Sequence, residues 1–230
     1  MHPIERVRLI CSRNGLALTD AQVEALRSYG ELLSSWNRRV NLVSRRDEED
    51  LWFAHILHSL SPWFVVTIPP GAVVLDLGTG GGLPGIPLAI LRSDLKIVLL
   101  DSVKKKSAAL AEIVRTLGLP NAEVHTGRAE EKPFRDTFRC DIVIARAVAP
   151  LVDLVRWSRP LLRAGTLPAG GTGMVPFGTL IAMKGGDLEA EIRTAQTKGG
   201  TMRIDVRDLR FDGSHEAGLV DKKLLLVSLI

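Results

Sequence analysis

The stretch with the clearest chemistry is a run of glycines that follows a short apolar segment. Val73-Val74-Leu75-Asp76-Leu77 leads into Gly78-Thr79-Gly80-Gly81-Gly82-Leu83-Pro84-Gly85. Glycines let a backbone turn sharply and approach a ligand closely, and free N–H groups at a helix start favour negative groups. Pro84 is acceptable in a first helical turn, where its missing donor costs nothing. The pattern predicts a strand, a ligand-binding turn and a helix, with a nucleotide-like ligand at the turn.

A single acidic residue follows the next apolar run, Lys96 to Leu100. Asp101 would lie at the carboxyl end of that strand, where a carboxylate can accept hydrogen bonds from a ribose diol. The alternative is that the glycines only make a tight turn and that Asp101 caps a helix opening at Ser102. Because strand, turn, helix and acid occur in the order that nucleoside-binding α/β folds require, we favour the nucleoside site.

The glycines alone do not identify the nucleotide. Gly80 through Gly85 also satisfies the G-x-G-x-x-G pattern of dinucleotide sites, whereas a P-loop is excluded because no Gly-Lys-Ser/Thr follows. Asp76 stands just before the first glycine, where a carboxylate would repel a diphosphate but could attract the ammonium of a methionyl group. We therefore predict S-adenosylmethionine as the cofactor, and a nicotinamide-dependent oxidoreductase is the alternative.

The elements that must position these residues form an alternating pattern from residue 71 onward. Uninterrupted apolar runs suit strands buried on both faces, and their alternation with helices indicates parallel βαβ units. The tail alternates over 202–206 and ends in an apolar run at 224–227, which predicts a closing antiparallel pair. Strands are expected at 73–75, 96–100, 142–144 and 179–183, and helices at 103–117, 151–162 and after the capping residue Asp187. The predicted fold is α/β, a mostly parallel, doubly wound, Rossmann-like sheet.

Residues 1–70 are expected to form a helical N-terminal section packed on the domain 71–230, and we interpret the two as one continuous unit. Thr19 and Gln22 are spaced as a capping box, and apolar residues then recur at helical spacing to about Trp36. A second helical stretch runs from Asp47 to about Leu60, where Pro62 argues against its continuing.

Composition restricts the class of protein. The chain has two cysteines, Cys11 and Cys140, too few for a disulfide framework, and no apolar run of the length of a membrane span. We expect a cytoplasmic monomer without a metal site and without membrane contact. The net charge of +4 and the pI of about 9.3 permit a polyanionic partner such as RNA.

In several of these motifs the sequence resembles the bacterial small-subunit ribosomal RNA methyltransferase G family, also called glucose-inhibited division protein B. The shared residues cover about residues 30–190 in the family's order: Trp36-Asn37, Asn41-Leu42, His55-Ile56-Leu57, Asp76 to Gly80, Leu83-Pro84-Gly85-Ile86-Pro87, Leu100-Asp101-Ser102, Arg128-Ala129-Glu130, Ala145-Arg146-Ala147 and Met183-Lys184-Gly185. The extension of the glycine loop from Leu83 to Pro87 is far more specific than the glycines alone.

The resemblance implies a class I methyltransferase that uses S-adenosylmethionine to methylate guanine N7 in the decoding-region loop of 16S rRNA, free or within the 30S subunit. It implies that Asp101 holds the ribose and that Arg146 lies near the methyl donor, and it makes Lys184 a candidate for contact with RNA. The expected cofactor-binding residues are Asp76, Gly78, Gly80, Leu83, Asp101, Ala129, Glu130 and Arg146, and the expected catalytic residues are Arg146 and Lys184.

Two positions depart from the family pattern. The family usually carries Arg and Asp where this chain has Ala54 and His58, so one positive and one negative side chain are lost together. A reciprocal salt bridge has been replaced, or target binding has been weakened. The altered segment also leaves open a non-catalytic RNA-binding protein on the same fold. The segment 167–178 is longer than the family's usual turn.

Guanine N7 carries an in-plane lone pair and no proton, so its methylation needs alignment of the base and no general base. Arg146 could donate to guanine O6, but a guanidinium cannot act as a base at neutral pH. The alternative to a functional role is an ion pair with a nearby carboxylate for Arg146, and exposure to solvent without a specific contact for Lys184. His55 and His58 are interpreted as packing or capping groups, and the lysines 104–106 first as an exposed helix start and secondly as a phosphate-binding patch.

Overall fold

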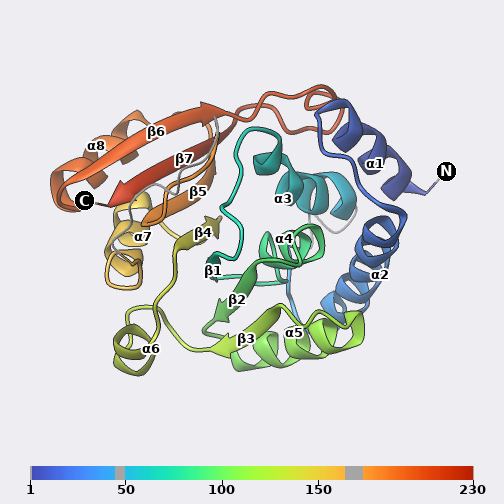
Figure 1. Cartoon of the computed structure of the whole chain (residues 1–230), viewed down its shortest axis with the longest axis horizontal. Helices are drawn as coiled ribbons and strands as arrows, with labels where there is room; N and C mark the ends of the chain where they lie inside the picture. The colour runs from blue at the N-terminus through green and yellow to red at the C-terminus, as the bar shows by residue number, and fades with distance from the viewer. Residues whose placement is uncertain (1, 45–49, 164–172, 230) are drawn as a thin grey trace.

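The computed structural model describes residues 2–44, 50–163 and 173–229, and its centre is a seven-stranded sheet (Figure 1). The strand order is β3-β2-β1-β4-β5-β7-β6. β1 to β5 are parallel, whereas β7 runs antiparallel between β5 and β6. The strands are β1 (Val73–Leu77), β2 (Lys96–Asp101), β3 (Ala122–Thr126), β4 (Ile142–Arg146), β5 (Thr179–Gly185), β6 (Met202–Asp208) and β7 (Lys222–Leu229). The predicted fold class and the antiparallel closing pair are confirmed.

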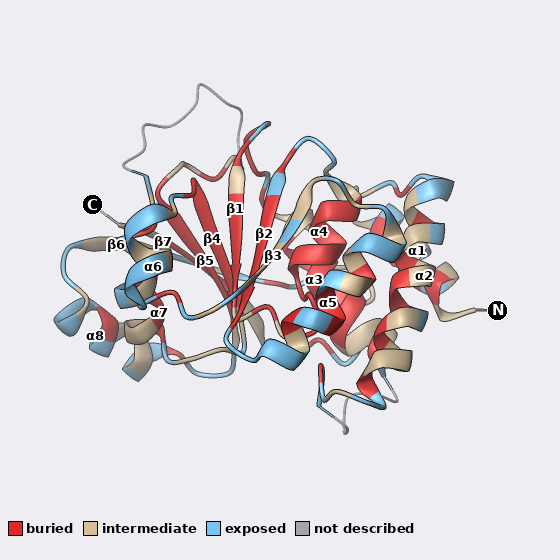
Figure 2. Ribbon diagram, turned by 90° about the horizontal axis from the view of Figure 1, so that it is seen from below, coloured by how far each residue is buried: buried red, intermediate tan, exposed pale blue. Residues whose placement is uncertain are grey.

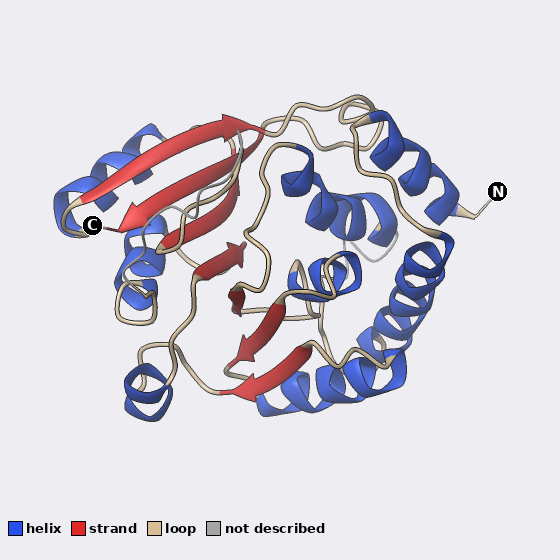
Figure 3. Cartoon of the chain, viewed as in Figure 1, coloured by secondary structure: helices blue, strands red, loops and turns tan. Residues whose placement is uncertain are grey.

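Helices cover both faces of this sheet, as Figure 3 shows. On one side lie α1 (Pro3–Arg13), α2 (Asp20–Asn37), the π-helix η2 (Leu51–Leu57), α3 (His58–Leu60), the 3-10 helix η3 (Ser61–Phe64), α4 (Gly85–Leu91) and α5 (Lys104–Leu117). On the other lie α6 (Lys132–Thr137), α7 (Leu151–Ser158) and α8 (Glu189–Lys198). Within the described ranges, no helix is long and apolar enough to cross a membrane.

Alternation along the strands divides the core into two hydrophobic clusters, one on each face of the sheet. Val74 packs with α4, α5 and the N-terminal helices, whereas its neighbour Leu75 packs with α7 and α8. Successive side chains of a strand point to opposite faces, so an uninterrupted apolar run feeds both clusters. Figure 2 shows the resulting buried central strands and the exposed outer faces of the helices. The buried apolar residues of α1 and α2 belong to the same hydrophobic cluster as Val74 and the other side chains on that face of the sheet.

The ends of two expected helices can be compared with the structure. A 3-10 helix, η3, extends to Phe64 with Pro62 in its first turn, where no donor is needed, but the α-helical part of the second stretch ends at Leu60, as expected. Its expected start at Asp47 lies outside the described residues. α7 ends at Ser158, two residues before Pro160, and not at Leu162.

Three elements were not predicted. α1 buries Ile4, Val7 and Cys11 at helical spacing, a signal that the sequence does contain. β3 is a half-buried edge strand, and α6 has no buried residue, so neither has a strong apolar pattern.

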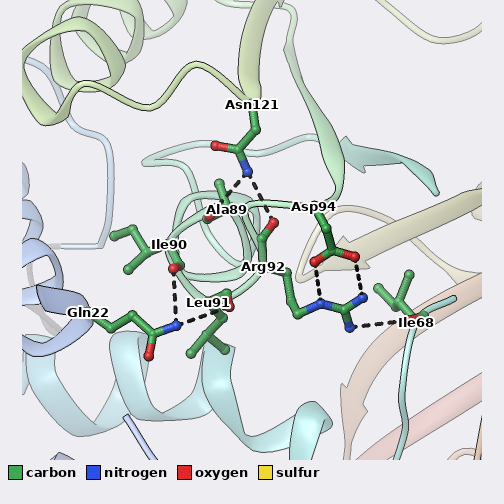
Figure 4. Close-up of polar contacts among 8 residues, drawn as sticks. All are labelled: Gln22, Ile68, Ala89, Ile90, Leu91, Arg92, Asp94 and Asn121. Carbon is green, nitrogen blue, oxygen red and sulfur yellow. Dashed lines mark hydrogen bonds and ion pairs between the residues drawn. The ribbon is translucent and has the colours of Figure 1, made fainter. Parts of the chain in front are cut away.

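The far end of α4 is fixed by side chains from two distant elements (Figure 4). Gln22 completes the predicted capping box of α2 and also donates to the Leu91 carbonyl at 3.1 Å. Asn121 donates to the carbonyls of Ala89 and Arg92, each at 3.1 Å. The last carbonyls of a helix have no partner inside it, so these side chains satisfy the end of α4. The helix that begins at the glycine loop is thereby held against α2 and β3.

Candidate active site

A cavity of about 490 Å³ opens at the carboxyl ends of β1, β2 and β4. In open α/β sheets this edge is where ligands bind. One wall is the glycine loop after β1, and the opposite wall combines η2 and α3 with the segment that leads into β7. The lining residues include Leu42, Asp50, Ala54, His55, His58, Gly78, Gly80, Leu83, Asp101, Lys106, Arg146, Leu219 and Lys222.

The glycine loop has a conformation and a packing that exclude side chains at two positions. Gly78 has a φ of +69°, and a Cβ there would lie 2.7 Å from a methyl group of Val148. At Gly85, a Cβ would lie 2.6 Å from a carboxylate oxygen of Asp76. Such distances are too short for real contacts, so these two glycines let the loop pack closely on the strands beneath it.

Asp76 lies underneath this loop and does not line the cavity. Its Oδ2 atom accepts hydrogen bonds from the Thr79 hydroxyl at 2.6 Å and from the Gly85 amide at 2.8 Å. Burial raises the pKa of Asp76 to about 6, although the bonds from Thr79 and Gly85 oppose this shift. In this structure Asp76 shapes the loop, and its expected contact with a methionyl ammonium stays a prediction.

Asp101 joins the glycine loop to the start of α5. Its Oδ2 atom accepts from the Gly80 amide at 3.0 Å and its Oδ1 atom from the Val103 amide at 2.8 Å. The residue is 8% exposed and lines the cavity, so each oxygen still has a lone pair that a ligand hydroxyl can use. The two interpretations of Asp101, helix cap and ligand acceptor, are therefore compatible.

Two loop amides already have carboxylate partners, since Gly80 donates to Asp101 and Gly85 donates to Asp76. Dinucleotide sites offer such amides to a diphosphate. Here the amides are occupied and two acidic groups stand behind them. The loop consequently suits a nucleoside without phosphate groups better than a dinucleotide.

A second cavity of about 340 Å³ adjoins the first and shares Gly78, Asp101 and Lys106 with it. Its walls include the apolar side chains of Leu77, Leu100, Val103, Ala129, Val148 and Trp157, together with Glu130. Ala129 is buried, whereas Glu130 is exposed at the rim. An apolar slot beside a ribose-binding carboxylate fits an adenine ring, so the donors and surfaces present are compatible with S-adenosylmethionine.

Arg146, at the end of β4, reaches across the cavity to η2. It donates to the carbonyls of Ala54 and His55, each at 3.4 Å, and one of its nitrogens lies 3.1 Å from His55 Nδ1. π-helical turns are rare in proteins, and those that occur are often found at functional sites. The guanidinium is half-buried and lines the cavity. η2 thus sets the position of Arg146.

The two departures from the family pattern lie beside Arg146. Ala54 contributes only a carbonyl to it. His58 is buried, and burial lowers its pKa to about 3, with further lowering by the charges of Arg146, Lys222 and His55. The imidazole is therefore neutral at pH 7. Neither position carries charge here, and backbone carbonyls hold the arginine.

Lys184 is not among the residues that line the cavity. Its ammonium donates to the Ala149 carbonyl and to Glu191, both at 2.7 Å, and its side chain is only 15% exposed. Glu191 also accepts from the Leu151 amide. Lys184 therefore connects β5 with α7 and α8, and its expected contact with RNA stays a prediction.

The structure also adds lining residues that the sequence patterns did not single out. Lys222 and the segment 217–219 come from the connection between β6 and β7, which carries no recognisable motif. Only their position at the carboxyl edge of the sheet identifies them. Lys106 belongs to the lysine run 104–106 that the sequence analysis considered, and it alone of the three lines the two cavities.

The fold and the site together define a class I S-adenosylmethionine-dependent methyltransferase. The fold is shared with the fibrillarin pre-rRNA processing protein of Methanococcus jannaschii, with a TM-score of 0.53, 12% identity, and coverage of 73% of this chain and 72% of that one. It is also shared with the ribosomal protein L11 methylase of Lactobacillus delbrueckii, with a TM-score of 0.53, 16% identity, and coverage of 76% and 78%.

Sequence similarity identifies the family. The chain belongs to the rRNA small subunit methyltransferase G (GidB) family, whose sequence model matches residues 22–217. It is 41% identical to the ribosomal RNA small subunit methyltransferase G of Chlorobium luteolum over 190 residues, which are 83% of this chain and 74% of that one. The enzyme of the same name from Bacteroides fragilis is 42% identical over 174 residues, or 76% and 80% of the two chains. The expected family is confirmed.

Proposed function

We propose that this chain transfers the methyl group of S-adenosylmethionine to N7 of a guanine in the decoding-region loop of 16S rRNA. The observation that carries the proposal is a cavity whose walls contain both the nucleoside site at β1 and β2, with Asp101, and the arginine at the end of β4. Membership of the rRNA small subunit methyltransferase G family supports the choice of substrate. When bound, S-adenosylmethionine supplies an electrophilic methyl group.

The cofactor would lie across the two adjoining cavities. Asp101 would accept hydrogen bonds from the ribose, and Ala129 and Glu130 would flank the adenine in the apolar slot. Gly78, Gly80 and Leu83 would contact the methionyl part along the glycine loop. Asp76 supports this loop from beneath through Thr79 and Gly85.

On the open side of the cavity, Arg146 would position the guanine. A guanidinium presents several fixed N–H donors and no acceptor, so it suits a purine O6 and cannot take a proton at neutral pH. N7 needs no deprotonation, and alignment of the base is the main requirement. The carbonyls of Ala54 and His55 in η2 accept hydrogen bonds from the arginine and help to place it, and His58 beside it is neutral.

Two other functions fit parts of the sequence less well. An oxidoreductase with a nicotinamide dinucleotide needs loop amides that are free for a diphosphate, whereas Gly80 and Gly85 donate to carboxylates of this chain. A non-catalytic RNA-binding protein would not need the elements that bind S-adenosylmethionine to be intact. We further propose that the protein acts as a monomer in the cytoplasm, with residues 1–70 packed on the domain 71–230.

The direct test incubates the protein with 30S subunits, and separately with naked 16S rRNA, in the presence of labelled S-adenosylmethionine. The expected product is N7-methylguanine in the decoding-region loop, mapped by chemical strand cleavage. Label at another base would redirect the proposal. Calorimetry distinguishes the methyltransferase from the oxidoreductase. Binding of NAD without binding of S-adenosylhomocysteine would overturn the proposed methyltransferase function.

A further inference from the structure

We propose that Lys222, the first residue of β7, binds a phosphate of the rRNA backbone next to the target nucleotide, an inference that rests on the proposed function. Lys222 lines the cavity and is half-buried. Its ammonium makes no hydrogen bond or ion pair with the part of the chain that the structure describes. A half-buried cation without such a partner indicates that its counter-charge comes from a ligand. Lys222 also lies beyond the residues 22–217 that match the family model.

The topology places Lys222 at the ligand-binding edge of the sheet. β7 is antiparallel to β5, and Lys222 pairs in register with Gly185 at the carboxyl end of β5. An antiparallel strand brings its amino end to the edge where the parallel strands have their carboxyl ends. Along this edge, the glycine loop after β1 is therefore followed by Arg146 of β4, then by Gly185 of β5 and Lys222 of β7.

Strand spacing separates Lys222 from the cofactor half of the cavity, by which we mean the part lined by the glycine loop and Asp101. Between β1 and β7 lie β4 and β5, so the two strands are three spacings apart, roughly 14 Å. Arg146 stands between them at the end of β4. A group that contacts Lys222 consequently lies beyond Arg146 as seen from the glycine loop, on the side where the nucleotide would enter.

The charges around Lys222 favour an anion. Arg146 and Lys222, from different strands, line the same cavity as His58, and the charges of both lower the pKa of this imidazole. Lys106 adds a third cation to the cavity lining. Like charges that line one cavity repel one another, and a bound phosphate would offset this repulsion. The charge-assisted contact would also fix the register of the RNA without reading its sequence.

The neighbouring lysine is a matched control. Lys223 is also half-buried and lies one residue further along β7, so its side chain points to the opposite face of the sheet. Its ammonium donates to the Gly186 carbonyl at 2.8 Å, and the residue does not line the cavity. The two lysines share charge and strand and differ in whether they face the cavity.

The test compares Lys222→Met, Lys222→Arg and Lys223→Met with the wild type, using 30S subunits and naked 16S rRNA. For Lys222→Met we expect KM for RNA to rise about tenfold, as for loss of one charge-assisted contact, with kcat changed less. The slope of log affinity against log salt should fall by about one. Lys222→Arg should keep most of the affinity, and Lys223→Met should behave as wild type.

Calorimetry with S-adenosylhomocysteine and thermal unfolding complete this test. Affinity for the cofactor product should stay within twofold in all variants. Wild-type KM and salt slope in Lys222→Met would overturn the inference. So would a tenfold loss of S-adenosylhomocysteine affinity, because the lysine would then bind the cofactor carboxylate. Failure of the wild type to methylate guanine N7 would instead overturn the proposed function.

Discussion

The cofactor half and the substrate half of the cavity are built in different ways. The cofactor half uses mainly the ends of neighbouring strands and the turns after them within residues 76–130, with Val148 and Trp157 added from the region after β4. The half that we propose for the substrate combines η2 and α3, Arg146 of β4, and the start of β7, which are far apart in the sequence. One half is a local motif, and the other exists only after the sheet has formed.

The two halves also differ in how their polar groups are satisfied. In the cofactor half, Asp76 and Asp101 accept backbone amides of the loop that they support. In the substrate half, Lys222 has no ion pair within the described residues, and Arg146 is held by neutral carbonyls. The comparison teaches that the polar groups of the nucleoside site are satisfied by the protein itself, whereas we propose that the charge of Lys222 is balanced by RNA.

Arg146→Ala should give the largest effect and decides to which half the arginine belongs. Loss of a positioned donor at a reacting group reduces turnover by about 100- to 1000-fold. We expect kcat for 30S methylation to fall by this amount, with affinity for S-adenosylhomocysteine and RNA changed only severalfold. The control is Arg163→Ala, whose ion pair with Asp141 lies at the opposite edge of the sheet. An equal loss of cofactor affinity would assign Arg146 to the cofactor half.

Asp101→Ala should damage the cofactor half alone. The change removes the acceptor of the Gly80 and Val103 amides and the expected ribose contact. Hydrogen bonds to a charged group are worth about 1.5–3 kcal/mol each, so the Kd for S-adenosylhomocysteine should rise about 100-fold. Affinity for RNA should be unchanged. Asp94→Ala, which breaks an exposed pair with Arg92, serves as control, and unaltered cofactor binding in Asp101→Ala would contradict the assignment.

Asp76→Asn should alter the pH dependence of stability. Burial raises the pKa of Asp76 from 3.8 to about 6, so the folded chain binds this proton more tightly than the unfolded chain. The stabilising contribution is complete below about pH 4 and is lost as the pH rises through about 6. Between these limits the wild type should lose on the order of 2 kcal/mol more unfolding free energy than Asp76→Asn. Denaturant titrations at several pH values measure this, and parallel curves would refute the buried carboxylate.

Lys184→Met should give the smallest effect, on stability and not on substrate binding. The ammonium holds Glu191 and the Ala149 carbonyl, so its loss should cost about 1–2 kcal/mol of unfolding free energy. Removal of the exposed pair in Arg193→Ala should cost less than about 0.5 kcal/mol. KM for RNA should be that of the wild type. A rise in KM without loss of stability would restore Lys184 to the substrate half.

The fold could be predicted from the sequence to a large extent, but less so near the substrate half. The strands around Leu75, Val98 and Val143 are continuous apolar runs because both faces are buried. By contrast, η2 follows no simple period and packs against α1 and α2, which are distant in the sequence. Lys184 was expected at the cleft because strand ends meet at this edge. Its ammonium donates to Glu191 on α8, a contact that no local pattern announces, and its expected role toward RNA stays a prediction.

The sequence by itself determined the parallel sheet, the glycine turn and the acid at the end of β2, because short-range periodicity, backbone freedom and strand order are encoded in neighbouring residues. Only the tertiary structure decided that Asp76 lies beneath the loop, that η2 sets the position of Arg146, and that Lys222 faces the cavity. These contacts join residues separated by whole elements, and no local pattern specifies which side chain the folded sheet will bring opposite another.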